Sequence, residues 1–282
     1  MSFISIIARQ LSSIFWASKK RLIDKNIYYK NIHKGETCFI LGNGASLKYY
    51  NFEKLSKLIS IGTNYTAMDS RAKHLNLKYC IIPAPYQFYK IRVNTYNYRL
   101  EKNLIEPIFK KMISENGGTN FFMHLSNYYS VRQWKNSNYF FDFGVRDNFC
   151  HDLDGKFFAK FGGLSAMIGL AKYMGFSKAI LLGCDYLGAP KLEGHFYDDG
   201  PLKYGSEDRR FCEQIFEISD EIELTCVFPK GITSRDFPSI SYEEFFNTKE
   251  HYHANSEIIN KDYYNLMRKA ANYNKKFPQI KF

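Results

Sequence analysis

The first residues whose spacing suggests chemistry form the run Gly42-Asn43-Gly44-Ala45-Ser46, directly after an apolar run at residues 37–41. Glycines let the backbone approach a ligand closely, and free amide groups at such a turn bind phosphate. The spacing is neither G-x-G-x-x-G nor a Walker A loop, because no G-K-[ST] follows. The run therefore predicts either a phosphate-binding turn or a plain turn after a strand.

Two further turns carry polar groups. Asn64 follows a second apolar run. Its side-chain amide would either form a hydrogen bond with a base edge or a phosphate oxygen, or cap the next helix. Gly162 and Gly163 precede Ser165 at the start of a helical pattern, where backbone N–H groups meet the positive end of the helix dipole. Asp185 ends the next apolar run and would accept a hydrogen bond from a ribose hydroxyl or cap its loop.

A loop histidine is the best candidate for proton transfer. His195 stands in the run Gly194-His195-Phe196-Tyr197-Asp198-Asp199-Gly200, before Lys203, Tyr204 and Arg209. A histidine near tyrosine hydroxyls and cations suits proton abstraction beside a phosphate leaving group. The alternative is an ordinary surface histidine.

Signals for metal ions and covalent nucleophiles are weaker. The run His151-Asp152-Leu153-Asp154 contains a D-x-D, which some sugar-nucleotide enzymes use to hold a divalent ion, but it is more typical of a solvated turn. The chain has no G-x-S-x-G, no H-E-x-x-H and no Cys/His spacing of a metal site. We therefore expect no metal site and no essential divalent cation.

The elements that position these residues alternate as in a doubly wound, mostly parallel α/β sheet. The pattern predicts strands at 37–41, 58–62, 78–83, 119–124, 179–182 and 223–228, and helices at 65–74, 99–115, 164–174, 207–222, 242–246 and 258–273. Residues 186–204 read as a polar loop, and residues 128–160 as an irregular lid or a small excursion. The domain prediction is an N-terminal helix over 1–30, a catalytic domain over 35–250 and a helical tail over 251–282.

Composition and the first helix indicate the partners and the cellular compartment of the protein. Its 282 residues carry a formal charge of +11, which favours anionic partners, and its six scattered cysteines favour a reducing cytosol. In residues 1–21, an apolar stripe from Phe3 to Phe15 precedes Lys19, Lys20 and Arg21. Such a helix either rests on an anionic membrane surface or packs on protein.

Four segments follow one another in a recognisable order: KGETCFILGNGASL, ISIGTNY, FGGLSAMIGLAKYMGFSKAILLGCDY and GHFYDDG. Together they resemble the bacterial superfamily of glycosyltransferase family 42 sialyltransferases, motility accessory factor glycosyltransferases and hydroxymethylpterin-diphosphokinase-like proteins. The resemblance covers about residues 35 to 246. Ala45 stands where the sialyltransferases carry Pro, and Gly162-Gly163-Leu164 where they carry Thr-Ser-Gly. The second departure is closer to the motility-factor and pterin-kinase branch.

The resemblance implies a Rossmann-like domain that takes CMP-activated nonulosonic acids, such as sialic, legionaminic or pseudaminic acid. By motif, the residues that match the family's phosphate-side loop and second-strand Asn are Gly42, Asn43, Gly44, Ser46 and Asn64. Those that match the loop facing the ribose and base, and the residue that closes the pocket, are Gly162, Gly163, Ser165 and Asp185. His195 falls where sialyltransferases place their general base. The hydroxyl groups expected at the leaving phosphate belong to Tyr186, Tyr197 or Tyr204, and the cations to Lys203 or Arg209.

We therefore expect a glycosyltransferase that moves a sugar from a CMP-sugar to a cell-surface glycan such as lipopolysaccharide or capsule, with no required cofactor. One alternative is a pterin-type diphosphokinase that uses ATP and Mg²⁺, for which the candidate ligands are Asp152, Asp154, Asp198 and Asp199. The other is a basic nucleic-acid-binding module, which the dispersed positive residues disfavour. The expected location is the cytoplasm, at the inner face of the plasma membrane, and a homo-oligomer fits the pattern.

Overall fold

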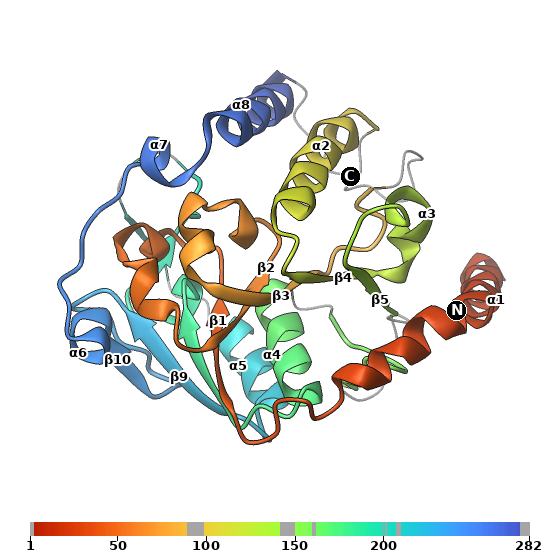
Figure 1. Cartoon of the computed structure of the whole chain (residues 1–282), viewed down its shortest axis with the longest axis horizontal. Coiled ribbons are helices and arrows are strands. Elements are labelled where there is room, and N and C mark those ends of the chain that lie inside the picture. The colour runs from red at the N-terminus through yellow and green to blue at the C-terminus, as the bar shows by residue number, and fades with distance from the viewer. Residues whose placement is uncertain are drawn as a thin grey trace.

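The computed structural model describes residues 3–88, 99–141, 150–159, 162–198, 200, 202–206 and 210–276. Its centre is a parallel sheet in the order β10-β9-β6-β1-β2-β3-β4-β5 (Figure 1). The strands are β1 (Thr37–Leu41), β2 (Ile59–Thr63), β3 (Asn76–Ile82), β4 (Asn120–His124), β5 (Ser137–Phe140), β6 (Lys178–Leu182), β9 (Glu223–Phe228) and β10 (Ser239–Ser241). A separate antiparallel pair consists of β7 (Lys191–Glu193) and β8 (Lys203–Gly205).

Helices cover both faces of the sheet. The helices are α1 (Phe3–Asp24), α2 (Arg99–Glu115), α3 (Tyr128–Val131), α4 (Gly163–Tyr173), α5 (Arg210–Ile218), α6 (Tyr242–Phe246), α7 (Asn255–Ile258) and α8 (Lys261–Lys276). Apolar side chains of α4 and α5 belong to the core on one face, and those of α2, α6, α7 and α8 to the core on the other. Figure 1 shows α8 alongside α2, where the Tyr263 hydroxyl donates to Glu115 at 2.6 Å.

The alternation of side chains along β1 shows why this sheet is buried on both sides. Cys38 and Ile40 belong to the core under α4, whereas Phe39 and Leu41 belong to the opposite core. Successive residues of a strand point to opposite faces, so a continuous apolar run fits a strand that is covered twice. The doubly wound α/β class predicted from the sequence is confirmed by the strand order.

The strand order reverses next to β1. From β1 the chain builds outward through β2, β3, β4 and β5, and it then returns to place β6 on the other side of β1. In such sheets the loops after the two strands at the reversal leave in opposite directions and open a crevice between them. The topology therefore places a ligand crevice beyond the carboxyl ends of β1 and β6.

The predicted helix at 65–74 is wrong in type. The segment forms two short 3₁₀ turns, at Thr66–Met68 and Ser70–His74. Asp69 interrupts the segment, because its side chain accepts from the backbone N–H of Arg71 and binds the Arg71 guanidinium at 2.6 Å. A side chain that satisfies nearby backbone in this way competes with a continuous helix.

The predicted irregular lid at 128–160 is also wrong in part. Within its described residues, Tyr128–Val131 forms α3 and Ser137–Phe140 joins the main sheet as β5, at its edge. The predicted loop at 186–204 contains β7 and the start of β8, and β10 follows the strand that was predicted to be last. These strands are short and half exposed, so they lack the apolar run that identified the central strands.

Candidate functional site

A cavity of about 600 Å³ opens beyond the carboxyl ends of β1 and β6. It is lined by residues 42–44 after β1, 63–64 at the end of β2 and 183–186 after β6. Residues 162–164 and 167 line it from α4, and residues 191–195 line it from β7 and the following loop. The cavity therefore lies where doubly wound sheets bind their ligands.

Most residues singled out in the sequence meet in this cavity. Those that line it are Gly42, Asn43, Gly44, Asn64, Gly162, Gly163, Asp185, Tyr186 and His195. Ser46 and Ser165 are fully buried and do not line it, and Tyr197 and Tyr204 do not line it either. The Asn43 turn and the Gly163 turn thus share one cavity, although they are far apart in the sequence.

The turn after β1 is held closed by Asp185. The Asp185 carboxylate accepts a hydrogen bond from the amide N–H of Ser46 at 2.8 Å and another from the Ser46 hydroxyl. The Gly44 amide donates to the carbonyl of Gly183 at 2.8 Å. A Cβ atom on Gly44 would lie 2.4 Å from the Asp185 carboxyl carbon, so the close approach of the two loops requires glycine. The amides of Gly44 and Ser46 are therefore used within the protein, which corrects the expectation of a phosphate cradle at these two positions.

Asp185 carries an ionisable group in the interior, with an exposed fraction of only 3%. Burial raises its pKa to about 6, and the hydrogen bonds from Ser46 oppose that rise. It accepts hydrogen bonds from Ser46 and from the backbone N–H of Ala45, on the loop after the neighbouring strand. Asp185 thus connects the loop that follows β6 to the loop that follows β1.

The two asparagines at the cavity differ in their roles. The Asn43 amide donates to the carbonyl of Thr63 at 3.2 Å, and its oxygen accepts from the Thr66 hydroxyl at 3.0 Å. Asn64 adopts a left-handed backbone with a φ of 48°, and its backbone N–H donates to the carbonyl of Ile81. Among the described residues, the Asn64 side chain has no hydrogen-bond partner. Asn43 therefore ties the loop to β2, and Asn64 remains available to a ligand.

The start of α4 provides hydrogen-bond donors at the cavity. Gly162 has a φ of 90°, a backbone conformation that favours glycine. A Cβ on Gly163 would lie 2.7 Å from Thr63 Oγ1, so the start of α4 lies in close contact with the end of β2. The amides of Gly163 and Leu164, which both line the cavity, precede the first backbone bond of the helix, from Ala166 to Gly162. Such amides lack intrahelical partners and lie at the positive end of the helix dipole. This end of the cavity favours an anion.

His195 is oriented by Asp198. The backbone N–H of His195 donates to Asp198 Oδ2 at 2.8 Å, and Nδ1 lies 3.2 Å from the same oxygen. The hydrogen bond from His195 holds the pKa of Asp198 below its usual value. The imidazole stacks on Tyr197 with 4.8 Å between ring centroids. With Nδ1 bound to the carboxylate, Nε2 is the nitrogen left for a substrate proton.

The His195 loop is attached to the loop after β1. Gly44 and His195 form an isolated antiparallel bridge, and the Phe196 amide donates to the carbonyl of Asn43 at 2.9 Å. The buried ammonium of Lys48 donates to the backbone carbonyls of Asp198 and Gly200. These bonds fix the imidazole relative to the cavity.

The three tyrosines predicted at a leaving phosphate are placed differently. Tyr186 lines the cavity, and burial raises the pKa of its hydroxyl well above the usual value. Tyr197 is largely buried, and its ring packs edge-on against Tyr65 with 5.2 Å between centroids. Tyr204 is 65% exposed on β8. Of the predicted cations, Lys203 is exposed and does not line the cavity, and Arg209 lies outside the described residues.

Sequence reasoning missed two charged residues of the cavity, Lys191 and Glu193. They flank the buried Leu192 on β7, so their side chains project to the same face of the strand. The period-two pattern K-L-E is the signal that would have found them. The pattern is weak, because three residues between turns are too few to be distinguished from a loop.

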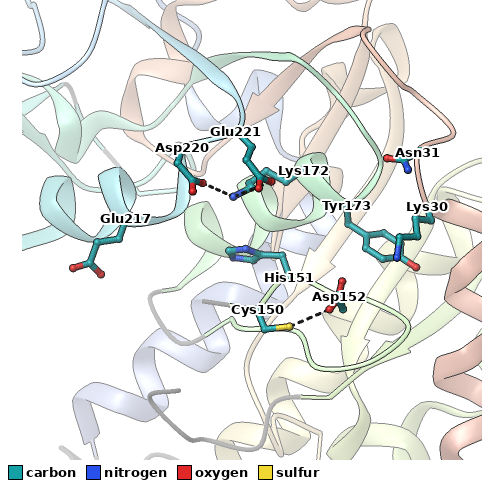
Figure 2. Close-up of a pocket in the computed structure, with 10 residues that line it drawn as sticks. All are labelled: Lys30, Asn31, Cys150, His151, Asp152, Lys172, Tyr173, Glu217, Asp220 and Glu221. Carbon is teal, nitrogen blue, oxygen red and sulfur yellow. Dashed lines mark hydrogen bonds and ion pairs between the residues drawn. The ribbon is translucent and has the colours of Figure 1, made fainter. Parts of the chain in front are cut away.

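A second cavity, of about 540 Å³, lies beside the end of α4, where Lys172 and Tyr173 line it. Figure 2 shows His151 among charged side chains there. Lys172 pairs with Asp220 at 2.7 Å, and the Cys150 thiol donates to Asp152 at 3.2 Å. Burial lowers the pKa of His151 to about 4. Asp152 of the D-x-D run therefore lines a different cavity from the one that contains His195.

The described residues contain neither a cluster of metal-ligating side chains nor a helix that could span a membrane. In this part of the chain, no group of three or more His, Cys, Asp or Glu side chains gathers as metal ligands would. The same residues include no helix with the length and hydropathy needed to cross a membrane.

No protein-family model matches the chain, and no curated protein matches it. Solved structures that it resembles include the sialyltransferase CstII from Campylobacter jejuni with cytidine-5'-monophosphate, at 14% identity and a TM-score of 0.42, covering 84% of this chain and 99% of that one. Two further structures are CstII with CMP-3FNeuAc and CST-II with a trisaccharide acceptor and CMP. Each is 14% identical with a TM-score of 0.43, covering 83% of this chain and 99% of that one.

Proposed function

We propose that the chain is a glycosyltransferase that moves a sugar from a CMP-sugar to a hydroxyl group of a glycan. The observation that carries this proposal is that one cavity contains both a candidate base and a candidate anion site. One is His195 with its Asp198 partner, a base for a hydroxyl proton. The other is the start of α4, which favours an anion. A transferase of this kind needs a base and an anion site close together.

The transfer is a single in-line displacement with inversion. His195 Nε2 takes the proton from the acceptor hydroxyl while its oxygen attacks the anomeric carbon of the donor. The bond from that carbon to the phosphate oxygen breaks, and the electron pair leaves with the nucleotide. Asp198 holds the imidazole and stabilises its positive charge once the proton has moved, as a carboxylate does beside a catalytic histidine.

A nucleoside monophosphate suits the charges of the cavity. Among its described lining residues, Lys191 is the one lysine or arginine, and the Glu193 carboxylate lies two residues away. The lining provides no cluster of cations of the kind that a triphosphate would require. A leaving group with one phosphate also needs no divalent cation to neutralise it, and we propose that transfer proceeds without one. The donor sugar in this proposal is a nonulosonic acid resembling sialic acid.

The acceptor in this proposal is a cell-surface glycan such as lipopolysaccharide or capsule, reached at the inner face of the membrane. The described part of α1 supports a membrane contact. Ile14 is 66% exposed, and Lys19 lies over the rings of Tyr128 and Tyr129 at 5.0 and 5.4 Å. Exposed apolar and aromatic side chains beside lysines suit the headgroup region of an anionic leaflet.

Nucleotide binding and His195 test the proposal together. CMP at about 100 times its dissociation constant should stabilise the folded chain by about 2.7 kcal/mol, seen as a higher melting temperature. His195→Ala should abolish transfer from a CMP-sugar and leave the affinity for CMP within about threefold, because the base acts on the acceptor. Undiminished turnover in this variant would remove His195 from the mechanism.

The same titration separates the alternatives. Stabilisation by ATP with Mg²⁺ and none by CMP would favour a diphosphokinase instead. Affinity for nucleic acid that falls steeply with salt, without any response to mononucleotides, would favour a nucleic-acid-binding module.

A further inference from the structure

The side chain of Lys191 is a cation at the cavity that has no partner in the part of the chain that the structure describes. The residue lies on β7 and lines the cavity, and its side chain makes no hydrogen bond or ion pair with any described residue. The Asp185 carboxylate at the same cavity is bound by Ser46. The Glu193 side chain lies over β8, where a Cβ on Gly205 would be 2.2 Å from Glu193 Oε1. The Lys191 ammonium is thus the lining cation that remains for an anionic ligand.

The position of Lys191 is coupled to that of His195. Both belong to one arm of the cavity, residues 191–195, so their Cα atoms are at most about 13 Å apart, the span of four extended residues. The arm is anchored at one end by β8, where Lys191 pairs with Gly205, and at the other by the bridge between Gly44 and His195. A donor in the cavity would therefore meet the base and the cation from the same arm.

We propose that Lys191 binds the phosphate of the nucleotide and stabilises the charge that develops on it as it leaves. This inference rests on the proposed function. In the displacement, the phosphodiester of the donor carries one negative charge. Rupture of the bond between sugar and phosphate places the electron pair on the phosphate oxygen, which becomes a dianion. The acceptor proton is then on His195, and the Lys191 ammonium lies beside the second charge. An interaction that strengthens as charge develops accelerates the step.

The test compares ligands that differ only in the phosphate. Binding of CMP and of cytidine is measured by calorimetry for the wild-type chain and for Lys191→Met and Lys191→Arg. Lys78→Met is the matched control, because Lys78 is an exposed strand lysine that does not line the cavity. Lys191→Met should weaken CMP binding about tenfold or more and leave cytidine binding unchanged, since a charged hydrogen bond to the phosphate is lost. Lys191→Arg should retain most of the affinity, and Lys78→Met all of it.

Kinetics provide the second measurement. Lys191→Met should lower kcat for transfer from a CMP-sugar, whereas loss of ground-state binding alone would raise KM. Equal weakening of CMP and cytidine binding would indicate a structural role and overturn the inference, as would unchanged CMP binding and kcat. If the wild-type chain binds CMP but Lys191→Met binds it equally well, only the role of Lys191 is wrong. If the wild-type chain binds no CMP, the proposed function is wrong as well.

Discussion

Among individual residues, Asp185 shows how a group expected to contact a ligand serves the fold. Its oxygens accept hydrogen bonds from Ser46, so the carboxylate holds two strand ends together beneath the cavity. A buried carboxylate is costly to ionise, and hydrogen bonds to backbone and hydroxyl donors offset that cost. The residue shapes the site by closing the loop after β1.

This burial predicts a pH dependence of stability. The pKa of Asp185 is about 6 in the folded chain, against an ordinary value of 3.8. Between these values the folded chain binds more protons at this position than the unfolded chain, so the free energy of unfolding falls as pH rises. Asp185→Asn cannot ionise and lacks this dependence. Its unfolding free energy relative to wild type, from urea titrations, should therefore rise from about pH 4 to about pH 7.

Asp262→Asn is a suitable control, because the Asp262 side chain is 69% exposed. Its unfolding free energy should follow the wild-type pH dependence. A flat or falling difference for Asp185→Asn would contradict the assignment of a raised pKa to this carboxyl group.

At the level of elements, the contact between α4 and β2 determines the shape of the cavity. Gly163 begins α4 where a Cβ would lie 2.7 Å from Thr63 Oγ1 and 2.8 Å from Thr63 Cγ2. The helix can therefore bring its free amide groups to the strand end only with glycine at this position. The Thr63 hydroxyl is itself fixed, since it donates to the carbonyl of Ile81 at 2.9 Å.

Gly163→Ala should displace the start of α4 from the end of β2. We expect a loss of stability of about 1–3 kcal/mol, the usual cost of overpacking, and weaker CMP binding because the amides move. Chemical denaturation and calorimetry measure the two effects. Gly117→Ala is the control, since a Cβ there meets nothing within 4 Å. Normal CMP binding by a folded Gly163→Ala chain would show that the start of α4 does not hold the nucleotide.

At the level of the whole molecule, the end of α1 is fixed to the body by the segment that follows it. Ile23 is fully buried, and the Asn26 amide donates to the carbonyls of Tyr139 and Leu153 at 2.7 and 2.9 Å. The described residues from Ile14 to Lys20 are half-buried or exposed. Phe15 and Trp16 still pack against the core, so removal of this part of the helix costs some stability, while the anchor at Ile23 and Asn26 is retained.

Deletion of residues 1–20 should release the chain from anionic vesicles and leave it folded, with a lower melting temperature because Phe15 and Trp16, which pack against the core, are lost with the segment. The physical reason is that the exposed apolar and basic side chains are lost while Ile23 and Asn26 remain. Sedimentation with anionic and with zwitterionic phospholipid vesicles measures the effect. The double variant Lys19→Glu and Lys20→Glu keeps the helix length, and it should also bind anionic vesicles weakly because the basic charges are lost. Failure of the full chain to sediment with anionic vesicles would contradict the membrane contact.

The central strands and the longer helices follow from the sequence alone. The runs at 37–41 and 223–228 coincide with β1 and β9, and the amphipathic segment 99–115 coincides with α2. Continuous apolar runs and helical periodicity reflect burial within one element, so local pattern reveals them. The short edge strands β5 and β10 are not predicted from the sequence, because their formation depends on pairing with β4 and β9.

For the site, the order and spacing of the apolar runs are enough to predict which turns meet. Gly42, Asn64 and Gly163 all adjoin strand ends or helix starts, and parallel strands bring such positions to one edge. Which groups at these turns remain available to a ligand depends on contacts between distant parts of the chain. The amide of Ser46 is bound by Asp185, which lies 139 residues away. The Lys191 side chain has no partner among the described residues, and it lies on a strand too short to predict. Hydrogen bonds between distant segments are set by the packing of the whole chain, and local sequence does not contain them.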